Sequence, residues 1–329
     1  MEYRKLGTTD IEVSVMALGC WPFAGGVVWG EQDDGQSIAT VHAALDAGIN
    51  FFDTAEGYEE GHSERVLGRG LAERRHEVVV ATKVSPNHLT ASGIAAACEQ
   101  SLENLQTDYI DLYQIHWPNH EIPIEESWRA LEGLAASGKV RALGVANFAS
   151  VDLADLVSLG SVASNQLPYG LLWRAIEFEV LAQCRERDVG LVCYAPLAQG
   201  LLTGRYASTD EVPDGLARTR WYAGSRSLAK HGEPGCEEAV FHALTGVRAV
   251  SERVGTPMAS VALAWVRQQQ GVTSFLVGAR NPEELAWNLP SLDLQLDSAT
   301  VAELEQLTQP VKQSLGQNVD MWFADSRMR

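Results

Sequence analysis

Basic residues are scarce in this chain compared with acidic ones. The 329-residue sequence contains 25 Lys and Arg but 43 Asp and Glu, which gives a formal net charge of −18 at pH 7. Binding to nucleic acid or to an anionic membrane surface needs a positive patch, so this balance argues against both. We interpret the excess of carboxylates as a solvated acidic surface.

Several sequence signals are also missing. The five cysteines form no CxxC pair, which is typical of reduced thiols rather than of a disulfide or zinc framework. No apolar run approaches the length of a membrane span, and the first residues contain no apolar segment of signal-peptide length. There is no GxGxxG after the first strand, no P-loop and no HExxH. We therefore expect a cytoplasmic protein without a metal site.

What the sequence does contain is a regular alternation of short apolar runs and helical patterns. Strands are predicted at residues 15–18, 49–52, 78–81, 109–115, 140–145, 164–167, 189–194 and 273–277. Alternation with helices implies a parallel sheet, and eight parallel strands can close a barrel. We predict an α/β fold in which residues 1–329 form a single (β/α)8 barrel of the triosephosphate-isomerase type, in preference to two domains.

Three parts of the chain lie outside this alternation. Residues 3–13 predict a β-hairpin, with its turn at residues 7–10. Residues 195–236 mix Pro, Gly, Ser and charge with little periodicity, and predict a long loop after the seventh strand that covers the site. Extra helices are predicted up to residue 254, over 257–269 and over 298–307.

Polar side chains stand where successive strands end. Asp53 closes one apolar run with Tyr58 in the loop behind it, Lys83 closes the next run, and His116 closes the one after that. The intervals are close to one strand, helix and loop, so neighbouring parallel strands would present these groups side by side. In a barrel of this type the working groups lie at that rim.

These four residue types together suit proton transfer to a carbonyl oxygen. A tyrosine has a pKa of about 10, and a nearby ammonium lowers it, so we predict that Lys83 acidifies Tyr58. Lys83 in an apolar strand needs a counter-ion, for which Asp53 is the candidate, and His116 can orient the carbonyl. No side chain supplies hydride, which implies a nicotinamide. The alternative is a structural Asp–Lys pair with Tyr58 and His116 as ordinary rim residues.

Motifs along nearly the whole chain resemble those of the aldo-keto reductases. They run in order through residues 53–58, 60–64, 81–83, 111–117, 144–148, 165–166, 194–204 and 278–288. The resemblance implies that Tyr58 is the general acid, that Lys83 and Asp53 tune it, and that His116 positions the substrate carbonyl.

The same resemblance implies a dinucleotide site. It places Asn147 and Gln166 on the nicotinamide carboxamide, and Tyr194 against the ring. The residues of its phosphate and adenosine parts are Leu197, Gln199, Gly200, Gly278, Arg280, Glu284 and Asn288. Helix capping by Asn147 and turn roles for the glycines are the alternatives. NADP(H) is favoured because of Arg280, and NAD(H) stays open.

Four positions depart from the pattern of the family. Glu59 and Ala146 replace a common glycine and serine, and Trp287 stands where an acidic residue is frequent. Glu284 lies where a 2′-phosphate would bind, and a carboxylate there repels phosphate.

The expected substrate is a small carbonyl compound, or a sugar or polyol in the reverse direction. The predicted pocket residues are Trp21, Trp29, Glu59, Trp117 and Trp322, with Phe23, Trp221, Tyr222 and Phe323 as further candidates. Glu59 and Asp320 favour a sugar or polyol, and the alternative for Trp221 and Trp322 is packing beneath loops. A nucleotide-binding regulatory subunit of the same fold, like channel-associated beta subunits, is the competing function; the oligomeric state is left open.

Overall fold

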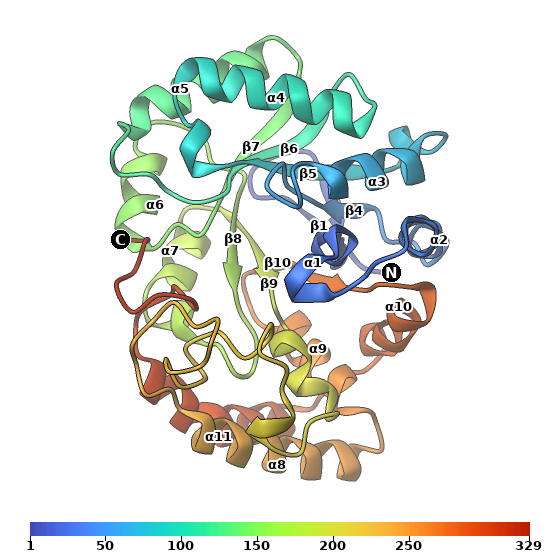
Figure 1. Cartoon of the computed structure of the whole chain (residues 1–329), viewed down its shortest axis with the longest axis vertical. Helices are drawn as coiled ribbons and strands as arrows, with labels where there is room; N and C mark the ends of the chain where they lie inside the picture. Colours follow the sequence, from blue (N-terminus) through green and yellow to red (C-terminus); the bar gives the residue numbers. More distant parts are fainter.

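A computed structural model describes residues 1–329, including every side chain except that of Val27. Eight parallel strands form a closed barrel in the order β10-β3-β4-β5-β6-β7-β8-β9, and helices surround it (Figure 1). The strands are β3 (Met16–Gly19), β4 (Phe51–Asp53), β5 (Val79–Val84), β6 (Ile110–Ile115), β7 (Val140–Ala146), β8 (Ser164–Pro168), β9 (Gly190–Tyr194) and β10 (Val272–Gly278). The predicted (β/α)8 barrel is confirmed.

Helices follow the strands around the outside of the barrel. They are α2 (Asp34–Asp46), α3 (His62–Leu71), α4 (Ala91–Leu105), α5 (Ile124–Ala136), α6 (Ser150–Val157), α7 (Val180–Glu186), α8 (Glu237–Val254), α9 (Met258–Gln268), α10 (Pro282–Asn288) and α11 (Ser298–Leu315). Short polar side chains begin several of them, as the Thr90 hydroxyl does by accepting from the Gly93 amide at the start of α4. The cap predicted at Thr90 is therefore confirmed.

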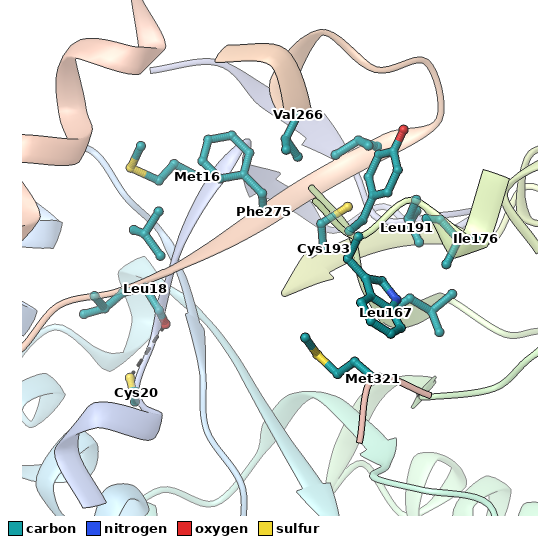
Figure 2. Packing of buried hydrophobic residues seen from close by; sticks show 14 of the residues in the cluster. Met16, Leu18, Cys20, Leu167, Ile176, Leu191, Cys193, Val266, Phe275 and Met321 are labelled. Carbon is teal, nitrogen blue, oxygen red and sulfur yellow. Dashed lines mark hydrogen bonds between the residues drawn. The ribbon is translucent and has the colours of Figure 1, made fainter. Parts of the chain in front are cut away.

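The core has two layers that follow the alternation of side chains along each strand. The larger layer lies between the barrel and the helices. Figure 2 shows part of it, to which β3 contributes Met16, β10 contributes Phe275 and α9 contributes Val266. The smaller layer fills the barrel, with Phe51 and Val79 among its members. Side chains at every second position of a strand lie on the same face of the sheet. A strand whose first residues point into the barrel therefore also has an inward-pointing side chain near its carboxyl end.

A hairpin closes the amino-terminal end of the barrel. Strands β1 (Tyr3–Lys5) and β2 (Glu12–Ser14) pair antiparallel, as predicted. Leu6, Ile11 and Val13 are buried in the same cluster as the barrel interior. Because the hairpin covers the amino-terminal end of the barrel, the uncovered end is the one at which the barrel strands end.

The segments over that face depart most from the predicted elements. The short helices η1 (Trp21–Ala24) and α1 (Gly26–Trp29) were not predicted, because residues 21–29 show no helical periodicity. The 195–236 segment holds two short 3-10 helices, η5 (Ala198–Thr203) and η6 (Thr209–Glu211), within the predicted long loop. It lies against the carboxyl-terminal tail, where the Arg220 amide donates to the Met321 carbonyl (Figure 1).

None of the helices in the described chain combines the length and apolar character that crossing a membrane requires.

Candidate active site

The predicted catalytic residues meet at the carboxyl-terminal rim of three adjacent strands. Asp53 is the last residue of β4, and Lys83 lies near the end of β5. His116 follows β6 directly, and Tyr58 lies in the loop between β4 and α3. The register pairs Asp53 with Ala81 and Lys83 with Gln114. The alternation of the strands therefore points both charged side chains inward above the apolar interior.

Lys83 and Asp53 form a buried ion pair. The Lys83 ammonium donates to Asp53 Oδ2 at 2.8 Å and to the Thr54 carbonyl at 2.7 Å. The other carboxylate oxygen accepts a bond from Gln166 Nε2 at 2.7 Å. Lys83 is fully buried and Asp53 is 2% exposed. Hydrogen bonds on both partners compensate for the loss of water that would otherwise make such a pair costly.

Tyr58 lies against this pair and against His116. The Lys83 Nζ is 5.2 Å from the centroid of the Tyr58 ring. The imidazole of His116 meets the same ring edge-on, with 5.7 Å between centroids. On its other side Tyr58 stacks on Trp21 at 6.0 Å. The structure thus brings all four predicted catalytic residues into one cluster.

Burial controls the charge states in this cluster. Burial, with Lys83 and Arg327 nearby, lowers the pKa of His116 from 6.5 to about 3, so the imidazole is neutral at pH 7. Burial and the carboxylate of Asp53 raise the pKa of Tyr58 well above 10. The prediction that Lys83 lowers the pKa of Tyr58 is therefore wrong in this structure. Its ammonium is neutralised by Asp53, which repels a phenolate.

The residues expected around a nicotinamide line the neighbouring strand ends. Asn147 follows β7 with a positive φ of 64°, and its side chain donates to the His116 carbonyl at 2.9 Å. The Tyr194 hydroxyl, at the end of β9, donates to Asn147 Oδ1 at 2.9 Å. Gln166 in β8 bonds Asp53, which links this group to the catalytic pair. These contacts hold Asn147 in place without making it a helix cap.

The segment after β9 contains several residues in left-handed backbone conformations. Ala195, Ala198, Gln199 and Gly200 all have positive φ, and Leu197 lies between them. Such a mixture of conformations occurs in anion-binding turns, but here the Ala198 amide donates to the Ala195 carbonyl and the Gly200 amide donates to the Leu197 carbonyl. The Cβ that Gly200 lacks would lie 2.6 Å from the guanidinium of Arg205. Arg205 therefore covers this loop, although the sequence analysis did not single it out.

Arg280 and Glu284 are paired with each other at the start of α10. The Arg280 guanidinium donates to Glu284 Oε1 at 2.7 Å, and its amide donates to Oε2 at 2.9 Å. Asn288 donates to the Glu284 carbonyl. At Gly278 a Cβ would approach Pro22 to 2.9 Å, so this glycine allows η1 to pack on β10. A phosphate at Arg280 would compete with a carboxylate that already holds the guanidinium.

Several aromatic residues predicted for the pocket contact one another or the tail near the carboxyl-terminal rim; their role in a substrate pocket stays a prediction. Trp29 meets Trp21 edge-on at 5.4 Å. The guanidinium carbon of Arg327 lies 3.4 Å from the ring centroid of Trp117. The same carbon lies 4.4 Å from the ring centroid of Phe323 in the tail. The tail therefore reaches the rim, which the sequence analysis expected of Trp322 and Phe323.

Four residues considered for the pocket are buried: Trp221, Tyr222, Phe23 and Asp320. Trp221 and Tyr222 are 1% and 2% exposed, and the Trp221 indole donates to the Leu172 carbonyl. Phe23 is buried in the core. Asp320 is fully buried and binds Arg327 at 2.8 Å, so it does not offer a free carboxylate to a sugar. These long-range contacts have no local sequence signal.

Glu59 is the exposed carboxylate of the rim. It adopts a positive φ of 48° and directly follows Tyr58 in the chain. Its carboxylate lies 3.6 Å from the position that a Cβ would take at Gly26. The charge thus faces the α1 turn at the mouth.

Among the described residues, no group of three or more His, Cys, Asp or Glu side chains is arranged to hold a metal ion.

Comparisons with known proteins agree with this geometry. Residues 15–309 match the model of the Aldo/keto reductase family. The chain belongs to this family. It is 34% identical to the aldo-keto reductase YhdN of Bacillus subtilis, over 92% of this chain and 94% of that one. It is 32% identical to an NADH-specific methylglyoxal reductase of Escherichia coli, over 95% and 100% of the two chains.

Solved structures of aldo/keto reductases share the architecture. A glycerol dehydrogenase from Gluconobacter oxydans superposes with a TM-score of 0.80 at 31% identity, over 94% of this chain and 95% of that one. An aldo-keto reductase from Klebsiella pneumoniae in complex with NADPH has a TM-score of 0.74 at 28% identity, over 94% and 96% of the two chains. A probable potassium channel beta subunit of rice is also similar, at 29% identity over 89% of this chain and 92% of that one.

Proposed function

We propose that this aldo/keto reductase interconverts a carbonyl and an alcohol with a nicotinamide dinucleotide, and that Tyr58 is its general acid and base. The observation that carries the proposal is the cluster of Tyr58, Lys83 and His116 above the buried Asp53. The Tyr58 phenol carries its proton at neutral pH and therefore has one to give to a carbonyl oxygen, although its raised pKa makes it a weaker acid than a free tyrosine. The neutral imidazole of His116 can hold that oxygen by a hydrogen bond.

The residues present fit a dinucleotide. The turn at residues 195–200, with its left-handed conformations, is the candidate for the pyrophosphate, and Asn147, Gln166 and Tyr194 are the candidates for the nicotinamide end. A bound nicotinamide supplies or accepts the hydride, while the chain's own residues orient the carbonyl and move the proton at its oxygen. Arg280 favours NADPH, and the carboxylate of Glu284 opposes it; NADPH is bound in one related structure, and a relative is named NADH-specific. We propose NADP(H) with NAD(H) as a working alternative.

Substitution of Tyr58 by Phe tests the proton-transfer role. We expect Tyr58→Phe to lower kcat for aldehyde reduction by roughly 10²- to 10⁴-fold, because a positioned acid contributes about that much. Tyr109→Phe, the same chemical change at the opposite end of the barrel, is the control and should keep its activity. The measurement is steady-state oxidation of NADPH and NADH against a panel of aldehydes and ketones. Full turnover by Tyr58→Phe would refute the assignment.

The same assay separates this function from the regulatory alternative. A binding subunit of this fold would take up a dinucleotide, as titration by fluorescence can show, but it would turn over no carbonyl in the panel. That alternative draws on the similarity to a probable channel beta subunit.

A further inference from the structure

Arg218 is a cation that contacts two indole rings near the mouth of the barrel. It lies in the long segment between β9 and α8 and is half-buried. Its guanidinium carbon is 4.6 Å from the ring centroid of Trp322 and 5.7 Å from that of Trp21. Trp21 in turn stacks on Tyr58. Arg218 is thus two ring contacts away from the proposed general acid.

No carboxylate neutralises this cation. Among the described residues, none lies within ion-pair distance of Arg218, and its buried Nε has no hydrogen-bond partner. Burial lowers the pKa of Arg218, with no carboxylate to oppose the shift. A half-buried guanidinium without a partner is costly, since charged groups that leave water are normally paired.

The other arginines of this region have the partners that Arg218 lacks. Arg220 binds Glu233 at 2.5 Å, and Arg226 lies 3.4 Å from Glu237. Arg327 binds Asp320 at 2.8 Å. In a chain with 43 acidic residues, carboxylates are not in short supply. The absence of a carboxylate next to Arg218 is therefore specific to this position and does not result from a shortage of acidic residues.

The two indoles lie 4.6 and 5.7 Å from the guanidinium carbon of Arg218, within the range of cation–π contacts. Stacking fixes the plane of an arginine and occupies its faces, while its N–H groups stay free at the edge. Those N–H groups form a rigid fork that matches the two oxygens of a carboxylate. Lysine or a hydroxyl would not give this shape.

We propose that Arg218 binds a carboxylate on the carbonyl substrate, at the end remote from the reacting carbon. This inference rests on the proposed function and specifies its substrate class as oxo-acids with separated carbonyl and carboxylate groups. Tyr58 and His116 hold the carbonyl, and the aromatic rim holds the carbon chain between the two polar ends. Asp320 does not oppose such an anion, because Arg327 neutralises it.

The test compares acids with their neutral esters. Unbranched ω-carboxy aldehydes of increasing length and their methyl esters are assayed as substrates of the wild-type protein and of Arg218→Gln, at saturating dinucleotide. We expect one chain length at which the wild type prefers the acid by about tenfold to a hundredfold in kcat/KM, as a charge-assisted hydrogen bond predicts. Arg218→Gln should remove this preference and keep the rate on the ester.

Two further variants complete the design. Lys230→Gln removes one positive charge from an exposed site in the same loop, so it should keep the preference and show that long-range charge does not cause it. Arg218→Lys keeps the charge but loses the fork, so an intermediate preference is expected. It also keeps the test open if Arg218→Gln does not fold.

Three results would overturn the inference. They are no preference for acids at any length, an equal preference in wild type and Arg218→Gln, or an increase in the KM for dinucleotide with an unchanged acid-to-ester ratio. The last would assign Arg218 to the phosphates of the dinucleotide. Calorimetric titration with glutarate, which has no reactive carbonyl, adds a readout without turnover: weaker binding to Arg218→Gln supports the site even if the proposed catalytic function fails.

Discussion

At the scale of single residues, the site is organised by how it compensates buried charge. Lys83 and Asp53 neutralise each other and share bonds with Thr54 and Gln166. His116 avoids the problem by staying neutral, and Tyr58 by staying protonated. Arg218 alone of these groups is left with its charge uncompensated. The protein itself thus supplies partners for, or keeps neutral, every buried ionisable group of the site except Arg218. The charge of Arg218 is left for an external anion to balance.

The lowered pKa of His116 predicts an acid-sensitive contribution to stability. As the pH falls below 6.5, the unfolded chain binds a proton at this imidazole that the folded protein does not accept until about pH 3. The contribution is therefore fully present above pH 6.5 and is lost as the pH falls through this window. We expect His116→Asn to lose less free energy of unfolding than the wild type between pH 7.5 and 5, as measured by urea denaturation.

The control for this comparison is His76→Asn, an exposed histidine near the other end of the barrel. Its stability should fall in parallel with that of the wild type. If His116→Asn also follows the wild type, the imidazole is not held neutral in the folded protein.

At the scale of single elements, helix α10 sets the charge around Arg280. Burial raises the pKa of Glu284, but the hydrogen bonds from Arg280 outweigh it and leave the carboxyl with a pKa below its usual value. Glu284 is thus ionised at neutral pH, and its carboxylate accepts hydrogen bonds from the guanidinium of Arg280. Arg280, just before the helix, and Glu284, in its first turn, thus place a cation and an anion next to each other at the proposed 2′-phosphate position.

Substitution of Glu284 by Gln should shift the choice of dinucleotide toward NADPH. We expect the ratio of kcat/KM for NADPH to that for NADH to rise about tenfold, because the phosphate no longer competes with a carboxylate for Arg280. Glu283→Gln makes the same charge change at the exposed neighbouring position and should leave the ratio unchanged. Equal ratios in Glu284→Gln and the wild type would place the 2′-phosphate elsewhere.

Elements with strong periodicity could be predicted from the sequence, whereas those fixed by distant contacts could not. The prediction for the run ending at Ile115 placed β6 to within one residue of its start, because most of its buried residues are apolar, with Asp111 and Gln114 as the exceptions. Helix α11 was predicted to end at residue 307 but continues through Pro310 to Leu315. Buried Val311 and Leu315 extend its apolar stripe, and this packing offsets the hydrogen bond that proline removes.

The same distinction explains which site residues were found. Asp53, Lys83 and His116 are recognisable because each interrupts or ends an apolar strand. Arg218 and Arg205 lie in a segment without periodicity, and their neighbours come from η1, from the tail and from the turn at Gly200. No spacing rule connects residue 21 with residue 322, so only the folded chain shows that both indoles contact Arg218.

At the scale of the whole molecule, the mouth of the barrel is completed by segments far apart in the chain. The tail returns across the rim, and Val151 and Asp152 of α6 donate backbone bonds to the Arg329 carbonyl. The hairpin packs on the other end of the same barrel. We propose that residues 1–329 form one domain, because each of these segments is buried against the strands or the helices of the barrel.

Arg327 links the carboxyl-terminal tail to the rim of the barrel by its contact with Trp117. Arg327→Gln would leave the buried carboxylate of Asp320 without its ionic partner and would remove the contact with Trp117. We expect faster hydrogen exchange in residues 318–329 and a higher KM for the carbonyl substrate, with little change in the exchange of the barrel strands. Arg253→Gln, which breaks a surface pair with Glu303, should change neither. Unaltered exchange in the tail of Arg327→Gln would show that other contacts hold it.

Closure of the barrel has a consequence for biosynthesis. The seam between the first and last barrel strands joins Met16 to Phe275, so the two edges that meet are among the earliest and latest parts of the chain to leave the ribosome. Until translation has passed Gly278, the nascent polypeptide carries two open sheet edges that only its own remaining strand can cover.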